Sequence, residues 1–338
     1  MPAVLFVAGM LLLIAACGGT TTTKTVTAAA SGGGTAGGSG ASLQESFVTV
    51  IARVAPEVVQ ISTSQGLGSG IVFDAKGDMV TNAHVVTGGG PFQVTDSRGR
   101  TYRATLVGTF AADDLAVVHA KGASLRSASF ADSRILRVGD IVLAIGNPLG
   151  LRSSVTNGII SALGRTVLEP SGAALPNAIQ TSANINPGNS GGALVNLDGR
   201  VIGVPTLAAT DPQLGGSAPG IGFAIPSFIV SDIAGQLIKY GHVVNSHRAY
   251  LGVELTAGVT GGAVVAAVTR GGPAARAGIT PGDGITFING QSVTTPADLS
   301  EALATLEPGH SVTVRITKQN GSHATVKVTL GQYPGGSR

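Results

Sequence analysis

Three short motifs carry side chains that could together break an amide bond. His84 lies in TNAHVV (81–86), Asp114 begins DLAVV (114–118), and Ser190 lies in NPGNSGG (186–192). A serine hydroxyl is too weakly acidic to attack a carbonyl alone, so it needs an imidazole to take its proton. A carboxylate then has to hold the imidazole in the correct tautomer. These residue types, in the order His, Asp, Ser, therefore indicate nucleophilic hydrolysis.

The glycines around Ser190 bear on how a developing oxyanion would be stabilised. Hydrolysis needs N–H donors aimed at that charge, and the amides of Gly188 and Ser190 can share one small space only if the backbone turns sharply. Glycines at 188, 191 and 192 permit such a turn. Each motif alone has an ordinary interpretation: a turn, a packed histidine, or an aspartate that starts a strand. Asp113 is an adjacent rival to Asp114, although a shift of one residue turns a side chain to the opposite strand face.

Taken together, the motifs resemble those of HtrA-type serine proteases, a bacterial branch of the chymotrypsin-like proteases with a C-terminal PDZ domain. The resemblance covers residues 43–331 and includes GFAIP (222–226). It implies that His84 is the general base, Asp114 its orienting partner and Ser190 the nucleophile, with the backbone N–H groups of Gly188 and Ser190 as the oxyanion hole. It also implies two β-barrels, with His84 and Asp114 on the first, Ser190 on the second, and the active site in the cleft between them.

The pattern of short strands agrees with a mainly β fold. Apolar runs separated by Gly, Asn and Pro turns predict strands at 58–62, 70–73, 102–107, 115–119, 141–145, 193–195 and 201–205. Regularly spaced short strands indicate a sandwich or a pair of barrels. A capping box in SLQE (42–45) predicts a helix that ends at Pro56. A second helix is expected over 226–238, which places the protease domain at 43–240.

A smaller unit follows a hinge at 241–249 and runs over 250–333. Its segment HRAYLGV (247–253) resembles the carboxylate-binding loop of an HtrA-type PDZ domain, with Tyr250, Leu251, Gly252 and Val253 as peptide-binding residues. A peptide C-terminus would add as a strand between Val253–Leu255 and a helix over 296–306. The alternative is a small domain that only packs on the protease or aids assembly.

The N-terminal segment resembles a bacterial lipoprotein signal. Residues 3–16 are apolar or glycine, too few to span a bilayer, and small residues precede Cys17, the expected lipidation site. Residues 17–42 consist of Gly, Ala, Ser and Thr apart from Cys17, Lys24 and Val26, which predicts a flexible tether. The alternative is an uncleaved signal anchor with an incidental cysteine. We expect a lipid-anchored, extracytoplasmic protein of the cell envelope.

Composition excludes several other classes. Charged residues are only 12% of the 338, the net charge is +3, and the basic residues are scattered, so nothing suggests nucleic-acid binding. A single cysteine excludes an internal disulfide and a cysteine-based zinc site. The expected mechanism needs no metal or organic cofactor.

The resemblance implies a serine endopeptidase for unfolded or misfolded cell-envelope proteins, with PDZ-mediated peptide recognition or regulation, assembled as a homotrimer. The alternative is a chaperone-like or peptide-binding scaffold whose protease fold is idle.

Two departures from related sequences concern activation and specificity. Digestive relatives carry Asp before the serine, where it pairs with a newly released N-terminus, but Asn189 is uncharged and cannot form that pair. We therefore expect other loops or a ligand to order the oxyanion loop, which could collapse reversibly. TSAN (181–184) replaces the family's usual TDAA, so no carboxylate lies there to attract a Lys or Arg side chain. The resemblance implies a preference for small aliphatic residues before the scissile bond.

Overall fold

The architecture comes from a computed structural model of the chain. It describes residues 39–64, 66–147, 154–169, 174–186, 188–211, 216–257 and 263–335. The expected signal peptide, Cys17 and residues 17–38 of the tether lie outside the described residues.

The first half of the protease region is a closed barrel of six antiparallel strands, in the order β1-β2-β3-β6-β5-β4. The strands are β1 (Val58–Ser62), β2 (Leu67–Val72), β3 (Asp78–Thr81), β4 (Phe92–Thr95), β5 (Thr101–Phe110) and β6 (Leu115–Ala120). The helical turn α2 (Ala83–Val86) follows β3, and the 3-10 turn η2 (Ala111–Asp113) precedes β6. His84 and Asp114 therefore leave the same barrel from two adjacent strands.

The second half is another closed six-stranded barrel, in the order β10-β11-β12-β9-β8-β7. Its strands are β7 (Ile141–Gly146), β8 (Ser154–Leu168), β9 (Ala174–Thr181), β10 (Ala193–Val195), β11 (Val201–Asp211) and β12 (Gly216–Pro226). The 3-10 turn η3 (Ser133–Ile135) lies in the connection between the barrels. The predicted pair of barrels, with Ser190 just before a strand of the second, is confirmed.

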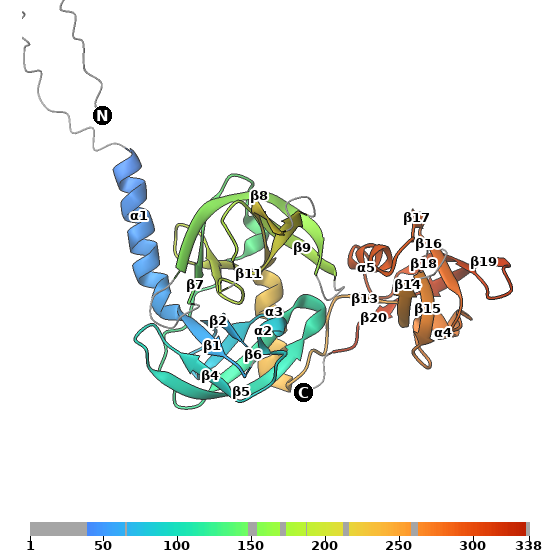
Figure 1. Cartoon of the computed structure of the whole chain (residues 1–338), viewed down its shortest axis with the longest axis horizontal. Helices are drawn as coiled ribbons and strands as arrows, with labels where there is room; N and C mark the ends of the chain where they lie inside the picture. The colour runs from blue at the N-terminus through green and yellow to red at the C-terminus, as the bar shows by residue number, and fades with distance from the viewer. Residues whose placement is uncertain are drawn as a thin grey trace, which may run out of the picture.

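One helix precedes the two barrels along the chain and another follows them (Figure 1). Helix α1 spans Ser39–Val54 and is followed by the 3-10 turn η1 (Ala55–Glu57). The capping box predicted at Ser42 is wrong, because the helix begins three residues earlier and Ser42 lies inside it, where its carbonyl accepts from the Ser46 hydroxyl. Helix α3 (Ser227–Tyr240) starts directly after Pro226, close to the predicted position, and ends where Gly241 adopts a left-handed φ of 76°.

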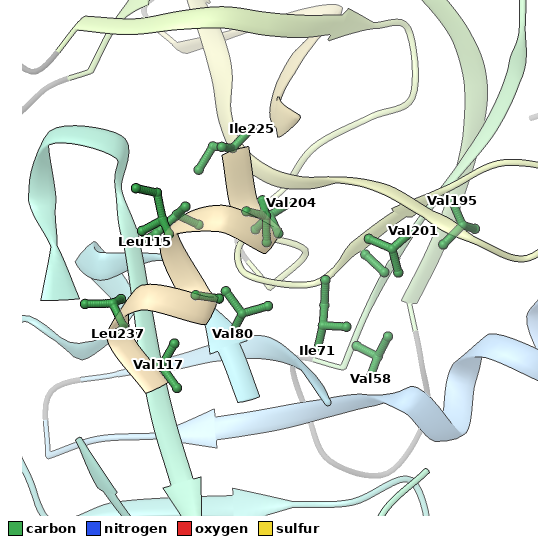
Figure 2. Close-up of a cluster of buried hydrophobic side chains, with 14 of the residues drawn as sticks. Val58, Ile71, Val80, Leu115, Val117, Val195, Val201, Val204, Ile225 and Leu237 are labelled. Carbon is green, nitrogen blue, oxygen red and sulfur yellow. The ribbon is translucent and has the colours of Figure 1, made fainter. Parts of the chain in front are cut away.

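The largest apolar cluster joins the two barrels to each other (Figure 2). It combines side chains of the first barrel, such as Ile71 and Leu115, with Val204 and Ile225 of the second and Leu237 of α3, all at most 3% exposed. Separate clusters fill the interior of each barrel. Burial of this shared surface fixes how the barrels face each other, and hence how the motifs on their loops meet.

The C-terminal domain is a sheet with two short helices. The sheet order is β14-β15-β16-β18-β19, with β17 paired to β16, and β13 pairs separately with β20. The elements are β13 (Ala249–Tyr250), β14 (Val253–Ala257), β15 (Ala263–Val268), α4 (Pro273–Arg276), β16 (Gly284–Ile288), β17 (Gln291–Ser292), α5 (Pro296–Ala304), β18 (Ser311–Thr317), β19 (His323–Thr329) and β20 (Gly331–Gln332). Helix α5 is shorter than the predicted 296–306. Strand β14 is an edge strand, so one side of its backbone is open for pairing.

Candidate active site

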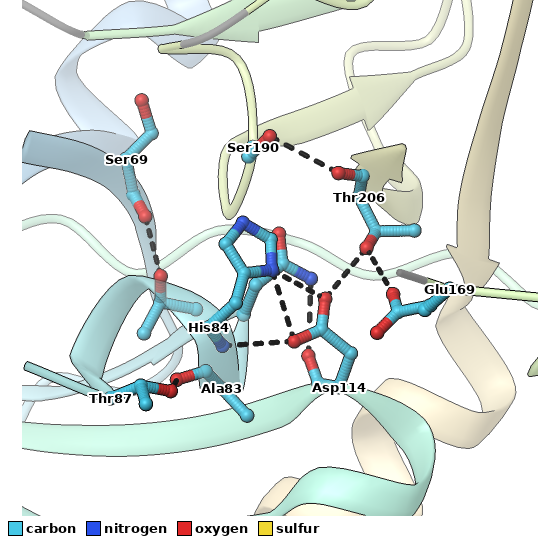
Figure 3. A network of polar contacts seen from close by, with 10 residues as sticks. Ser69, Ala83, His84, Thr87, Asp114, Glu169, Ser190 and Thr206 are labelled. Carbon is cyan, nitrogen blue, oxygen red and sulfur yellow. Dashed lines mark hydrogen bonds and ion pairs between the residues drawn. The ribbon is translucent and has the colours of Figure 1, made fainter. Parts of the chain in front are cut away.

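His84 and Asp114 form a close pair on the first barrel (Figure 3). The imidazole Nδ1 lies 2.9 Å from Asp114 Oδ2, and the backbone N–H of His84 donates to Asp114 Oδ1 at 3.0 Å. Asp114 is held there by a left-handed backbone, φ 48°, at the end of η2. The His84 side chain is 48% exposed and that of Asp114 only 3%. A buried carboxylate on Nδ1 leaves Nε2 of the ring to act as a base.

The adjacent carboxylate, Asp113, faces a different partner. Its Oδ1 accepts from the guanidinium of Arg248, which also donates to the carbonyls of Ala112 and Ala174. Asp113 therefore contributes to the attachment of the segment before β13, whereas Asp114 contacts the imidazole.

His119 belongs to a second histidine–aspartate pair on the same barrel. It is half-exposed, and its Nδ1 lies 2.8 Å from Oδ1 of Asp78.

Ser190 reaches the same network through Thr206 rather than through His84. Its Oγ donates to the carbonyl of Thr206 at 3.2 Å, and within the described residues it makes no hydrogen bond to the imidazole (Figure 3). The Thr206 hydroxyl donates to Asp114 Oδ2 at 2.6 Å. The three motifs thus meet in one connected set, but the direct serine–histidine contact is not formed. Apo contacts of this kind often tighten only when substrate binds.

The loop around Ser190 leaves two amides free. Asn189 N–H donates to the carbonyl of Asn186, and Gly192 N–H donates to that of Asn189. The N–H groups of Gly188 and Ser190, in contrast, donate to no acceptor among the described residues. Gly188 has φ 111° and Gly191 has φ 78°, backbone conformations that favour glycine. Two unpaired donors beside a serine match the requirement for binding an oxyanion.

A second acid, Glu169, lies beside the His84–Asp114 pair. Its Oε1 is 2.9 Å from the Thr206 hydroxyl, so one hydroxyl group contacts two carboxylates. Burial, reinforced by the charge of Asp114, raises the pKa of Glu169 to about 7. Burial lowers the pKa of His84, but the hydrogen bond and charge of Asp114, with the charge of Glu169, outweigh this and raise the pKa above its ordinary value.

Sequence reasoning missed both Thr206 and Glu169. Thr206 looks like an ordinary residue of a strand, and Glu169 follows the end of β8 with no motif around it. No local pattern in the sequence marks either residue.

A hydrogen bond links Asn189 and Asn184 within the second barrel. The buried Asn189 side chain donates from Nδ2 to the carbonyl of Asn184 at 3.2 Å, and the hydroxyl of Thr156 donates to the same carbonyl at 2.8 Å. Asn189 is thus bound to its own barrel, at the position where digestive relatives use an ion pair. The side-chain preference of the substrate pocket stays a prediction.

Comparisons with known proteins agree with this architecture. The trypsin-like peptidase domain family matches residues 68–204, and the PDZ domain family matches residues 249–330. The solved structure of the HtrA-type protease AlgW with a decapeptide superposes with a TM-score of 0.60 at 33% identity, over 85% of this chain and 99% of that one. The chain belongs to the HtrA-type serine proteases.

Curated HtrA-type relatives include periplasmic and mycobacterial enzymes. The chain is 41% identical over 276 residues to the periplasmic pH-dependent serine endoprotease DegQ of Escherichia coli, a match that covers 79% of this chain and 59% of DegQ. It is 40% identical over 306 residues to the serine protease PepD of Mycobacterium tuberculosis, over 84% of this chain and 65% of PepD. The chain therefore spans about three fifths of the length of DegQ.

The PDZ domain of this HtrA-type chain contains a groove of about 250 Å³ between β14 and α5. The loop before β14 lies at one end, where Gly252 has φ 82°, and the N–H groups of Leu251 and Gly252 donate to no acceptor among the described residues. Leu255, Leu299 and Leu303 make the walls apolar. Free amides at the end of an apolar groove with an open strand edge suit a peptide that ends in a carboxylate.

The part of the chain that the structure describes holds no cluster of three or more His, Cys, Asp or Glu residues able to bind a metal ion. Nor does it contain a helix with the length and apolar character needed to cross a bilayer.

Proposed function

We propose that this protein is a serine endopeptidase that hydrolyses peptide bonds of unfolded or misfolded cell-envelope proteins. The observation that carries the proposal is the connected set Ser190–Thr206–Asp114–His84 beside the two free amides of Gly188 and Ser190. The names of DegQ and DegP, periplasmic serine endoproteases, support the same activity and an extracytoplasmic location.

In the proposed mechanism, a rotation about the Cα–Cβ bond of Ser190 moves Oγ from the Thr206 carbonyl to Nε2 of His84. His84 takes the hydroxyl proton as Oγ attacks the scissile carbonyl, and the resulting imidazolium is stabilised by Asp114. The amides of Gly188 and Ser190 bind the oxyanion. His84 then gives its proton to the leaving amine, and a water molecule activated by the same imidazole releases the acyl group.

The PDZ domain is proposed to bind the C-terminus of a polypeptide through Tyr250, Leu251, Gly252 and Val253. The groove between β14 and α5 supports this, as does the AlgW structure, which contains a decapeptide. We also propose a homotrimer and a lipid on Cys17 that anchors the chain to the membrane. These two rest on the family resemblance and on the sequence before residue 18. Sedimentation velocity tests the first, and incorporation of labelled palmitate into wild type but not Cys17→Ser tests the second.

Cleavage of unfolded casein tests the proposed activity. Wild type should cut it, whereas Ser190→Ala and His84→Ala should fall to the same residual rate, because the two groups act as a unit. His119→Ala is the matched control, since it breaks a second histidine–aspartate pair on the same barrel, 2.8 Å long, and should retain activity. Equal cleavage by wild type and Ser190→Ala would contradict the role of Ser190 as nucleophile, and no cleavage by either would favour the idle scaffold.

A further inference from the structure

Ser69 lies in β2 of the first barrel and reaches across to the serine loop of the second. The residue is completely buried. Its backbone N–H donates to the carbonyl of Ser190 at 3.0 Å, and its hydroxyl donates to the carbonyl of Gly188 at 2.5 Å. Ser69 therefore binds the carbonyls of Gly188 and Ser190, the two residues whose N–H groups donate to no acceptor among the described residues.

Ser69 is itself fixed from two directions. Its hydroxyl accepts a hydrogen bond from the backbone N–H of Asn147 at 2.7 Å, at the end of β7. Its carbonyl accepts from the hydroxyl of Thr81 at 2.7 Å, three residues before His84. The Ser69 hydroxyl thus donates to Gly188 and accepts from Asn147, and these two bonds set its orientation.

Two peptide units of the serine loop are each fixed at both their carbonyl and their N–H. The peptide unit between Gly188 and Asn189 is fixed at one end by the Ser69 hydroxyl and at the other by the carbonyl of Asn186, which accepts from Asn189 N–H. The unit between Ser190 and Gly191 is fixed by the N–H of Ser69 and the carbonyl of Pro205. Between these fixed units, the amides of Gly188 and Ser190 donate to no acceptor in the described part of the chain, an arrangement that preorganises them for an anion.

We propose that Ser69 is a positioning residue of the oxyanion hole, acting through the carbonyls of Gly188 and Ser190 and not on the substrate itself. The inference rests on the proposed function, and it assigns to a residue of the first barrel a part in shaping the oxyanion hole of the second. Loss of the Ser69 hydroxyl leaves the Gly188 carbonyl and the Asn147 N–H without their partner in a buried place, and a buried unsatisfied group is costly. The serine loop relieves that cost by turning, which misaligns the two amides.

The test compares Ser69→Ala with Ser227→Ala. Ser227 is also completely buried, and its hydroxyl donates to the backbone carbonyl of Ala131 at 2.6 Å, away from the serine loop. With a chromogenic peptide, kcat of Ser69→Ala should fall about 10- to 100-fold with little change in KM, less than the roughly 10²–10³-fold expected for loss of a donor itself. Ser227→Ala should keep the wild-type kcat even where its melting temperature falls equally.

A peptide aldehyde provides a readout that a general loss of stability does not move. Ser190 adds to the aldehyde and places an oxyanion at the two amides, whereas the corresponding peptide alcohol binds without that charge. Ser69→Ala should weaken inhibition by the aldehyde by the factor lost in kcat and leave that by the alcohol unchanged. If both inhibitors weaken equally, or neither does, the proposal is wrong.

Ser69→Cys covers the case in which Ser69→Ala does not fold. A thiol keeps the shape of the side chain but is a weak donor and acceptor, so the folded variant should have a reduced kcat. If Ser190→Ala is inactive in the same assay, a wild-type kcat in folded Ser69→Cys or Ser69→Ala overturns the inference about Ser69 and leaves the proposed function standing. Activity in Ser190→Ala would instead overturn the proposed function.

Discussion

The hydroxyl of Thr206 on the second barrel donates a 2.6 Å hydrogen bond to the carboxylate of Asp114 on the first. The carbonyl of the same threonine accepts from Ser190, and its hydroxyl also lies 2.9 Å from Glu169. A single residue therefore connects Ser190, the proposed nucleophile, with Asp114, the proposed orienting carboxylate, and with a second acid (Figure 3).

Replacement of Thr206 by valine should lower kcat about 10- to 100-fold. The change removes a hydrogen bond to a charged group, which is worth roughly 1.5–3 kcal/mol, and Asp114 then holds the imidazole less firmly. Peptide hydrolysis under saturating substrate measures the effect. Thr206→Ser keeps the hydroxyl and should recover most of the rate. Equal losses in the two variants would show that the methyl group, not the hydrogen bond, matters.

Replacement of Glu169 by glutamine should move the acid limb of the pH profile to lower pH. His84 must be neutral to act as a base, so kcat/KM rises as pH passes through its pKa, which Asp114 and Glu169 raise above the ordinary value of a histidine. The charge of Glu169 helps to raise that pKa, so its removal makes the imidazole easier to deprotonate. Profiles of kcat/KM from pH 5 to 9 test this, with Asp198→Asn, an exposed carboxylate of the same barrel, as the control. An unmoved or rising midpoint would contradict it.

Replacement of Gly191 by alanine should abolish activity and lower the melting temperature. The residue has φ 78°, and an added Cβ would lie inside van der Waals contact with the Ser69 carbonyl and the Thr81 hydroxyl. Gly199→Ala separates the strain of a positive φ from the effect of the close contact. Gly199 also has a positive φ, 66°, but the nearest neighbour of its added Cβ, Cδ of Arg53, is 3.3 Å away. That variant should lose only about 1–2 kcal/mol of stability and remain active. Comparable damage from both substitutions would argue against the close contact as the cause.

A peptide with an apolar last residue and a free carboxylate should bind the PDZ domain. Leu303→Glu places a charge in the apolar groove and should raise the dissociation constant at least about tenfold, or 1.4 kcal/mol. Fluorescence anisotropy of a labelled peptide measures this in the full chain. Glu301→Gln on the exposed face of α5 is the control variant, and an amidated peptide should bind weakly. Undiminished binding of the amidated peptide would show that the loop at Leu251 and Gly252 does not hold a carboxylate.

Local sequence patterns predicted the positions of several strands of the fold. The strand runs near 58–62, 115–119, 141–145 and 193–195 lie within a residue of the observed strands, because apolar β-branched runs between glycine turns have few other ways to be buried. The start of α1 was misplaced, since Ser-x-x-Glu also occurs inside a helix and the Gly/Ala/Ser/Thr composition before it gives no competing signal.

The sequence by itself determined which side chains are available for the chemistry and the order in which they occur: His84, Asp114 and Ser190, with glycines where the backbone must turn. Only the tertiary structure placed Asp114 rather than Asp113 against His84, turned Ser190 toward Thr206, and brought Ser69 and Glu169 to the site. Each of these contacts joins segments distant in the chain across the surface between two barrels. Their geometry is set by how those barrels pack, and no neighbouring residue in the sequence records it.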